Sequence, residues 1–378
     1  MIKSLQLVDF KPFRDTGKIK LGSLNILAGT NGKGKSSLLQ GLLLLSQSIR
    51  QSEQHIPDNL QINGDYVNLG SFDDLINTNA GSKSFQFHLV TDSENDNDFL
   101  MSYTKIDGED EWGRLFSLKV NGIEKFSNAG FYIDEGGENQ APEIIAPAFS
   151  GYTSLIRIQK LYYVAAAREA SRGEEELVPA SKHIHLDCQG RNVLNVMYKQ
   201  GPDFCRMLEE QMSLIFDGAS FSIRNDGKSV RLYMDSIDKG RNFHPVNVGY
   251  GFSYILTLLV AGLLAQKDEI IIVENPEAHL HPSAQAAVMR FFCELVIQRG
   301  VQIFIETHSD HIVNASLLAV RNGNLDSELL EIMFFSRNAG DVDINIRNLE
   351  ISSKGRVKNP PKNFCDQYAM DLRALMGM

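Results

Sequence analysis

The sequence predicts an α/β protein built on a mixed, largely parallel sheet, with an antiparallel β insertion and a helical subdomain. An apolar strand at Leu24–Leu27 runs into a glycine-rich turn and then into a helix at Lys35–Arg50, whose leucines recur at helical spacing. Two further apolar runs, Ile270–Glu274 and Val301–Glu306, are separated by a helical pattern, as in parallel βαβ units. Asn121-Gly122 lies between two apolar runs and marks an antiparallel hairpin.

The other elements follow in chain order. A strand near Ile2–Val8 precedes the glycine-rich turn, and apolar residues alternate with polar ones at Phe85–Leu89, as in a half-buried strand. A second hairpin turns at Asn225–Lys228, and residues 161–215 look mainly helical after a buried strand at 161–165. The expected segments are 1–50 (N-terminal half of the core), 51–160 (antiparallel β-rich insertion), 161–245 (helical and hairpin subdomain), 246–340 (C-terminal half of the core) and 341–378 (small C-terminal segment).

Composition and charge narrow the class of protein. Of the 378 residues, 43% are hydrophobic and 22% charged, as in globular proteins, and the formal net charge is −10. This charge argues against binding nucleic acid through a broadly basic surface. The four cysteines form no CxxC pair, which disfavours a disulfide framework or a Cys-rich zinc site. The longest apolar stretch, Phe252–Ala265, is too short to span a bilayer, and Asp9 interrupts the apolar run of a signal peptide. We therefore expect a cytoplasmic protein with no membrane partner.

The strongest functional motif is Gly29-Thr-Asn-Gly-Lys-Gly-Lys-Ser36, which fits the P-loop pattern G-x-x-x-x-G-K-[ST] between a strand and a helix. Its glycines let successive backbone N–H groups point at phosphate oxygens, and the following helix adds its positive dipole end. We expect Lys35 to reach the β- and γ-phosphates of ATP and Ser36 to ligate Mg²⁺. The residues expected to bind the nucleotide are Gly29, Asn31, Gly32, Gly34, Lys35, Ser36 and Ser37.

Three further motifs lie where strands end or a helix begins. Glu274 ends an apolar strand, where P-loop ATPases keep the carboxylate that holds magnesium through water, so it is the second expected metal ligand. His308 follows the next strand, where it could bond a γ-phosphate, although a lone histidine there is more often structural. A glycine-rich segment before an apolar helix is by itself often only a turn, but beside a P-loop it suggests a second anion site, for the γ-phosphate of a partner subunit. Its residues are Gly249, Gly251 and Ser253.

Two other segments could indicate a zinc or a calcium site, but both interpretations are less favoured. The histidines at 279, 281, 308 and 311 imitate a zinc site, which is the less favoured interpretation. The acidic stretch Thr91–Asp98 suggests calcium, but Asn97 occupies the glycine position of an EF-hand loop and Tyr103 its twelfth position. A solvated loop is the better interpretation of that stretch.

Together these motifs resemble the ABC-type branch of P-loop ATPases, which includes RecF, the SMC heads and the OLD (overcoming-lysogenization-defect) ATPases. The matching segments are Leu7–Phe13, Asn31–Ser37, Gly249–Ser253, Glu274–Pro282 and Thr307-His308. The resemblance implies an ABC-type ATPase head that forms an ATP-dependent head-to-head homodimer, or a higher oligomer. In it, Gly251 and Ser253 of one subunit would cover the ATP of the other.

The chain is also similar to compact bacterial AAA-family ATPases that end in a small C-terminal domain. The matching segments are Tyr66–Phe72, Tyr163–Arg168 and Gly355–Leu375. Members of this kind occur as ATPase subunits of anti-phage systems, including Septu-like ones in which the partner is an HNH nuclease. The resemblance therefore implies a separate effector protein, such as a nuclease, as a second partner.

One position departs from the ABC pattern. Where that pattern has Asp-Glu-Pro, this chain has Glu274-Asn-Pro276, so an amide replaces the acid that accepts a proton from water. An amide orients water but takes no proton, so we expect hydrolysis to be slow. Glu277 and Glu306 are the candidate bases, and their spacing does not choose between them. A phosphate oxygen is a further alternative.

Three functions fit these observations. The leading one is an ATP-binding, slowly hydrolysing ATPase that regulates a separate effector in anti-phage defence. The second is a RecF-like DNA-maintenance ATPase that contacts DNA directly, through a basic run that more often means a solvated surface. The run consists of Lys354, Arg356, Lys358 and Lys362. The third is an ATP-stabilised scaffold that does not hydrolyse.

Overall fold

The computed structural model describes residues 1–51, 56–106, 108–127, 152–169, 173–179, 181–182, 184–235, 243–247, 249–337, 341, 343–362, 364–365 and 374–376. These residues fall into two compact units, which are described separately. Unit 1 comprises Met1–Gly22, Thr30–Leu161 and Phe335–Asn348, and unit 2 comprises Ser23–Gly29, Tyr162–Phe334 and Leu349–Met378. The five segments expected from sequence were defined by pattern rather than by compactness, and they stay a prediction.

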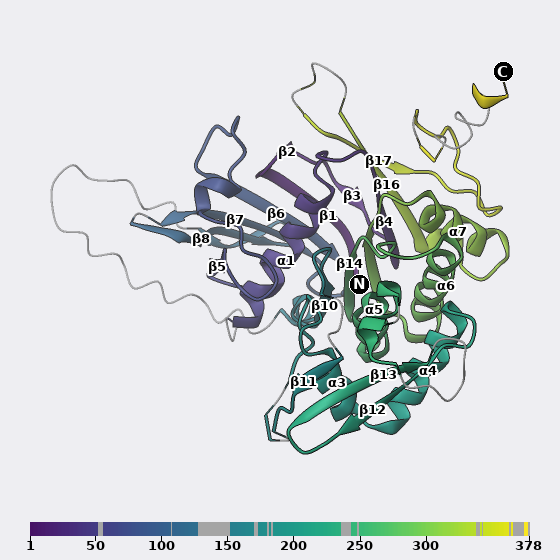
Figure 1. The fold of residues 1–378 in the computed structure, drawn as a ribbon. Coiled ribbons are helices and arrows are strands. Elements are labelled where there is room, and N and C mark those ends of the chain that lie inside the picture. Colours follow the sequence, from purple (N-terminus) through teal and green to yellow (C-terminus); the bar gives the residue numbers. More distant parts are fainter. Residues whose placement is uncertain are drawn as a thin grey trace. The chain divides into compact units, whose positions relative to one another are not determined.

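Unit 1 is built on an antiparallel sheet in the order β2-β1-β6-β7-β8-β5, with β3 paired to β1 and β9 to β8 (Figure 1). Its strands are β1 (Ile2–Phe10), β2 (Phe13–Asp15), β3 (Ile19–Lys20), β5 (Asn59–Gln61), β6 (Ser84–Thr91), β7 (Asp98–Ile106), β8 (Glu109–Val120) and β9 (Ile123–Ser127). The sheet thus joins the first strand of the chain to strands from the expected insertion.

Two sequence patterns in this sheet are confirmed. Burial alternates residue by residue along β6, with Phe85, Phe87 and Leu89 facing the core. Asn121 and Gly122 form the two-residue turn between β8 and β9, with φ of +52° and +73°. Positive φ at both turn residues matches the right-handed twist of the strands, and these two residue types adopt it readily.

Helix α1 (Lys35–Gln51) buries polar as well as apolar residues. The Gln47 side chain accepts hydrogen bonds from the backbone of Tyr66 (3.2 Å) and Val67 (3.0 Å), and its amide donates to Gln61 O (2.6 Å). These bonds satisfy backbone groups at the end of β5 and in the irregular segment that follows it. The helix therefore organises residues 61–67 through side-chain bonds, and helical periodicity alone does not predict them.

Unit 2 contains most of a six-stranded sheet with the order β10-β14-β15-β4-β16-β17. The strands are β4 (Leu24–Gly29), β10 (Leu161–Val164), β14 (Ile270–Glu274), β15 (Gln302–Glu306), β16 (Leu330–Ser336) and β17 (Asn345–Leu349). Strands β14, β15 and β4 are parallel neighbours. Nearly every residue of these three strands is buried, which explains their continuous apolar runs. The α/β fold with both parallel and antiparallel strands is as the sequence predicted.

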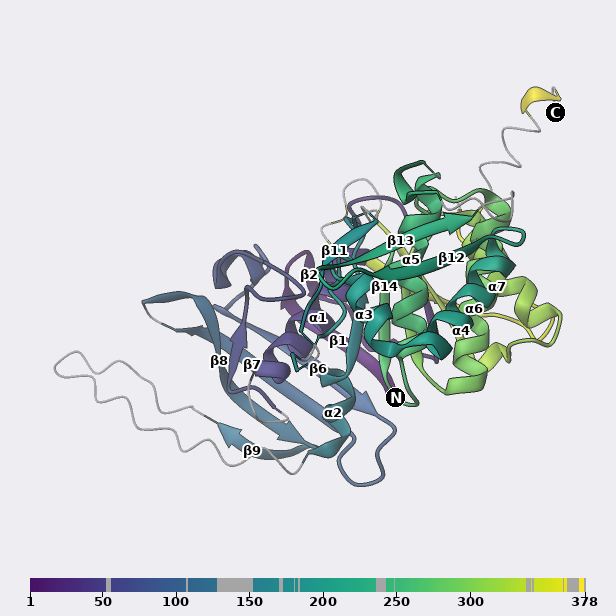
Figure 2. The ribbon, with the colours of Figure 1, turned by 60° about the horizontal axis from the view of Figure 1, so that its bottom comes forward.

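Helices accompany this sheet, and Figure 1 and Figure 2 both show α6 beside α7. The helices of unit 2 are α3 (Val193–Gln200), α4 (Pro202–Ile215), α5 (Tyr250–Leu264), α6 (Pro282–Arg299) and α7 (Asp310–Arg321), and unit 1 adds the short α2 (Ile156–Gln159). A separate sheet has the order β11-β13-β12, with β11 (Glu174–Glu176), β12 (Ser220–Asn225) and β13 (Ser229–Asp235). No helix among the described residues has both the length and the apolar composition needed to cross a bilayer.

The expectation that residues 161–215 are mainly helical was too broad. Between β10 and α3 the described residues contain the short strand β11 and otherwise irregular backbone. Side chains hold this backbone: Asn192 accepts a hydrogen bond from Asp187 N (2.9 Å) and donates one to His185 O (2.7 Å). Such local side-chain bonds compete with helix formation, and the helix begins only at Val193.

Candidate nucleotide-binding site

The P-loop motif lies at the turn from β4 into α1. Its glycines Gly29, Gly32 and Gly34 have φ of +130°, +69° and +83°, a backbone region that side chains disfavour. A Cβ on Gly34 would also lie 2.7 Å from the ring of Phe13. The loop conformation therefore depends on glycine at these three positions, as expected for a backbone that presents N–H groups to phosphates.

Lys35 opens α1 and is 3% exposed. Its Nζ donates a hydrogen bond to Thr30 O at 3.0 Å, so the side chain folds back over its own loop. Asn31, Gly32 and Ser36 are exposed. The loop thus combines a buried lysine head with an exposed edge from which polar groups can reach a ligand.

Two acids lie side by side at the carboxyl ends of β14 and β15. Glu274 and Glu306 are register partners, and Leu27 of β4 is the next partner along. Parallel strands present their carboxyl ends at one edge of a sheet, so both acids share the edge at which β4 leads into the P-loop motif. This is the geometry in which P-loop ATPases place the magnesium carboxylate.

The surroundings of Glu274 favour a cation. Its Oε2 accepts a hydrogen bond from Ala166 N at 3.2 Å, and it is also hydrogen-bonded to the Tyr163 side chain. Burial raises the pKa of the Glu274 carboxyl above its usual value, while those two bonds offset part of the rise. Burial, followed by the charge of Glu274, also raises the pKa of the Tyr163 hydroxyl. A buried carboxylate is stabilised by a cation beside it, and the charge of Arg168 acts on Glu274 in this way.

Asn275 follows Glu274 with a φ of +45°, in the left-handed region. Its N–H donates to Glu306 O at 2.8 Å, which ties the end of β14 to the end of β15. The side-chain oxygen Oδ1 is buried and has no hydrogen-bond partner among the described residues. Asparagine is one of the few residue types that adopt this conformation readily, so the backbone itself favours it here.

Glu277 is engaged by the segment that contains the candidate switch histidine. One carboxylate oxygen accepts from Thr307 Oγ1 and the other from His308 N, each at 2.8 Å. His308 itself is an exposed residue. Glu277 therefore positions the backbone at Thr307 and His308, whereas Glu306 lies beside Glu274 in the sheet.

The glycine-rich segment before α5 divides into an exposed and a buried part. Gly249 is exposed, Gly251 is half-buried, and Ser253 is only 3% exposed. A Cβ on Gly251 would lie 2.8 Å from His279 O, so this glycine permits α5 to approach the loop after β14. The predicted contact of Ser253 with a partner subunit stays a prediction, and of the three residues Gly249 is the most accessible.

Arg168 is a residue of this region whose function the sequence did not reveal. It is 3% exposed, and its guanidinium donates to the backbone oxygens of Glu274 and Asn275, each at 2.8 Å. The sequence carries two signals: Arg168 ends the segment Tyr163–Arg168 that resembles the compact AAA-family ATPases, and it is a lone cation directly after an apolar strand and three alanines, Ala165–Ala167. A cation in such a run is a candidate for a paired, buried charge.

The alternative sites receive no support from the described residues. No three His, Cys, Asp or Glu side chains in that part of the chain gather as a metal cluster. His281 instead caps α6 by accepting from Ser283 N, and the His279 ring lies 4.4 Å from the Tyr254 ring. In the basic run, Lys358 forms an ion pair with Glu350. The positive charge of Lys358 is therefore partly neutralised within the protein, which weakens the case for DNA binding by this run.

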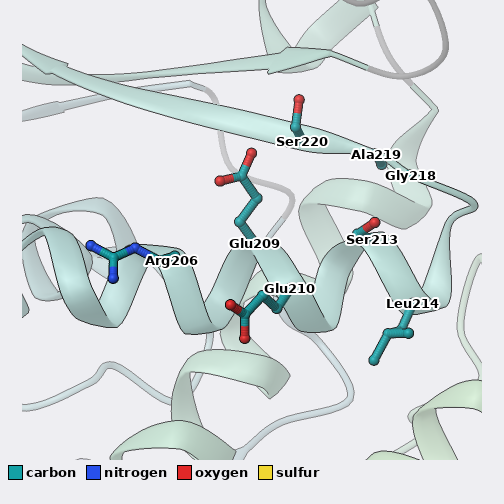
Figure 3. A pocket seen from close by; sticks show the side chains of 8 residues that line it. All are labelled: Arg206, Glu209, Glu210, Ser213, Leu214, Gly218, Ala219 and Ser220. Atoms are coloured by element: carbon teal, nitrogen blue, oxygen red, sulfur yellow. The ribbon is translucent and has the colours of Figure 1, made fainter.

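A hollow of about 650 Å³ lies in unit 2 between α4 and the start of β12 (Figure 3). Glu209 and Glu210 line it together with Arg206, and Figure 3 shows Glu209 pointing toward Ser220 of β12. Adjacent carboxylates repel phosphate groups, and none of the candidate nucleotide residues lines this hollow. It is therefore distinct from the proposed ATP site.

Comparison with known proteins agrees with this geometry. The chain is similar to an SMC head bound to the C-winged helix domain of ScpA, with 12% identity, a TM-score of 0.55, and coverage of 92% of this chain and 98% of that one. It is also similar to an SMC head with an extended coiled coil, bound to the C-terminal domain of ScpA derived from Pyrococcus furiosus. The identity there is 11%, the TM-score 0.52, and the coverage 100% and 99%. At these identities the likeness shows the fold, which is that of an SMC-type head.

A sequence relative is the OLD nuclease of Thermus scotoductus, 22% identical over 335 residues and 82% of this chain. The match spans 59% of the length of that relative, so the activity of the whole relative does not transfer to this chain directly. The family profile described as "AAA domain, putative AbiEii toxin, Type IV TA system" matches residues 24–314, which is more than half of the chain. The chain belongs to this AAA-domain family, and its fold is like that of SMC heads.

Proposed function

We propose that this protein binds and slowly hydrolyses ATP, dimerises head-to-head on ATP, and thereby regulates a separate effector in anti-phage defence. One observation supports the ATP site most strongly. The P-loop motif follows β4 at the same sheet edge at which Glu274 and Glu306 end the neighbouring strands. An anion-binding loop that continues from β4, together with carboxylates at the ends of the neighbouring strands, suits a magnesium–triphosphate complex.

In this proposal each motif has a separate task. Lys35 exchanges its bond to Thr30 O for the β- and γ-phosphates, while the glycine backbone binds phosphate oxygens. Ser36 and Glu274 supply hard oxygen donors of the kind that Mg²⁺ prefers. The metal would neutralise phosphate charge as the terminal phosphate leaves, and His308 is the candidate contact to that phosphate.

Slow turnover follows from the residues at the strand ends. Asn275 offers an amide that cannot accept a proton from water. Of the two candidate bases, Glu277 already accepts hydrogen bonds on both carboxylate oxygens, which makes it a positioning group. We therefore favour Glu306 as the acid that assists the attacking water.

The proposal includes two partners, a second copy of the chain and a separate effector. Support for a dimer comes from the resemblance of the motifs to ABC-type ATPase heads. Support for an effector comes from the ScpA domain bound to a similar SMC head and from the relative that is a nuclease. ATP bound at an interface between two heads would stabilise the closed dimer and release it after hydrolysis. Direct DNA contact through the basic run remains the alternative.

Steady-state ATP turnover tests this function. Wild type should hydrolyse ATP slowly with Mg²⁺, Lys35→Ala should lose this activity, and Lys18→Ala, a change at an exposed lysine of unit 1, should keep it. Glu306→Gln should lower kcat by about 10²-fold or more, as expected for a general base, with a smaller loss in Glu277→Gln. Turnover that survives in Lys35→Ala would contradict the proposal. ATP binding without any turnover would identify the scaffold instead.

A further inference from the structure

Arg168 is a fully enclosed cation at the edge of the sheet where β14 ends. Its Nη1 donates to Ala165 O at 3.1 Å and to Glu274 O at 2.8 Å, and its Nη2 donates to Asn275 O at 2.8 Å. Its Nε is buried with no hydrogen-bond partner among the described residues. Burial lowers the pKa of Arg168 to about 10, and the charges of Glu277 and Glu274 offset part of this effect. The side chain is thus charged at neutral pH, and it is bound mainly to backbone carbonyls.

Those carbonyls belong to the two residues on which the proposed chemistry depends. The chain leaves β14 at Glu274 and turns through the left-handed conformation of Asn275, which costs about 1 kcal/mol even where it is tolerated. On one side Asn275 N donates to Glu306 O, and on the other the fork of Arg168 binds both carbonyls. The turn is therefore fixed from two directions, and with it the side chains of Glu274 and Asn275.

The same guanidinium contacts α5, the helix that follows the glycine-rich segment. The Tyr254 ring has its centroid 5.7 Å from the Arg168 guanidinium carbon, and the centroid of the His279 ring is 4.4 Å from the same centroid. The close approach of Gly251 to His279 O packs the first turn of α5 against the same loop. Arg168 thus contacts both the strand end and α5.

We infer that Arg168 is a positioning residue for ATP hydrolysis, which holds the Glu274–Asn275 turn in its working geometry and links that turn to helix α5 through Tyr254. This inference rests on the proposed function, because it assigns a task within that reaction. It separates Arg168 from the nucleotide-binding residues, since its side chain is buried and its guanidinium is bound to the carbonyls of Ala165, Glu274 and Asn275. A planar fork is required, because one ammonium group cannot bind two carbonyls in the same directions.

The test measures kcat, KM for ATP and thermal unfolding for matched variants. Arg168→Lys should lower kcat by about 10²-fold, as a small misplacement of catalytic groups does, with KM changed less than about threefold. Tyr254→Leu should lower kcat in the same way, whereas Tyr254→Phe, which keeps the ring, should match wild type. The control is Arg224→Lys, because Arg224 also stacks on a tyrosine, Tyr233, at 4.9 Å, but on the exposed β12–β13 hairpin.

Each outcome decides the inference. An unchanged kcat in folded Arg168→Lys would overturn it while wild-type turnover leaves the proposed function intact. Equal losses in Arg168→Lys and Arg224→Lys would also overturn it, because the effect would then be general. If Arg168→Lys does not fold, Tyr254→Leu against Tyr254→Phe gives the result: equal kcat in the two overturns the link to α5. Absent wild-type turnover would instead reject the proposed function.

Discussion

Asn275 affects both the backbone conformation at the end of β14 and the expected rate of ATP hydrolysis. In sequence it stands where ABC ATPases have the acid that accepts a proton from water. In the structure its φ is +45°, and its N–H bonds the neighbouring strand at Glu306 O. Asparagine and aspartate adopt this conformation more readily than longer side chains. The left-handed turn therefore favours a short polar side chain over glutamate at this position, and the amide in particular has its consequence for hydrolysis.

Substitutions at Asn275 separate the two effects. Asn275→Asp should keep the turn and add a carboxylate, so turnover should rise at least about tenfold. Asn275→Glu should lower the free energy of unfolding by about 1 kcal/mol, because a longer side chain is strained at positive φ. ATP turnover and urea unfolding measure these effects. A Glu variant as stable as wild type, or an Asp variant with unchanged turnover, would contradict the account.

At the scale of elements, the sequence predicted best where periodicity and burial agree. The alternation in β6, the Asn121-Gly122 turn and the apolar runs of β14 and β15 all reflect side chains that face one core. The irregular backbone between β10 and α3 was not predicted, because isolated side-chain bonds to backbone hold it. The same limit hid Arg168, since its partners are carbonyl oxygens that every sequence carries.

Asp187 tests one such element, the loop that leads into α3. Burial acts to raise its pKa, but hydrogen bonds from Arg191 and Gln189 outweigh it, and the pKa of Asp187 lies below its usual value. A lowered folded-state pKa stabilises the fold above the unfolded pKa of about 4, and this contribution is lost as pH falls through the folded value. Asp187→Asn should therefore cost about 1–2 kcal/mol at pH 7, and this cost should shrink as the pH falls below about 4.

Urea unfolding at several pH values measures this difference. The matched control is Asp203→Asn. Asp203 also forms an ion pair with an arginine, Arg206, but its side chain is 86% exposed, so the free energy of unfolding should change very little at any pH. A cost for Asp187→Asn that is the same at pH 3 and pH 7 would show that packing, rather than the charge, explains it.

At the scale of the whole molecule, the account requires two copies to associate when ATP is bound. Gly249 is the accessible residue of the segment before α5, with an ordinary φ of −49° and open space around its Cα. Gly249→Arg should therefore fold and bind ATP normally but fail to dimerise, because a bulky cation would occupy the contact surface. Light scattering after size exclusion, with ATP and Mg²⁺, measures the mass.

The control for that experiment is Gly81→Arg, at an exposed glycine of unit 1 that likewise has open space around it. It should dimerise as wild type does. Dimers of Gly249→Arg equal in amount to those of wild type would remove Gly249 from the interface. A wild type that stays monomeric with ATP would contradict head-to-head association itself.

Isothermal titration calorimetry with ATP and Mg²⁺ tests the central claim most directly, namely that the loop from Gly29 to Ser36 binds a triphosphate. Wild type should bind ATP at one site per chain, and Lys35→Ala should bind at least about tenfold more weakly, because it loses a charge-assisted bond to phosphate. Folded wild type that takes up no ATP, or Lys35→Ala that binds as wild type does, would contradict the account.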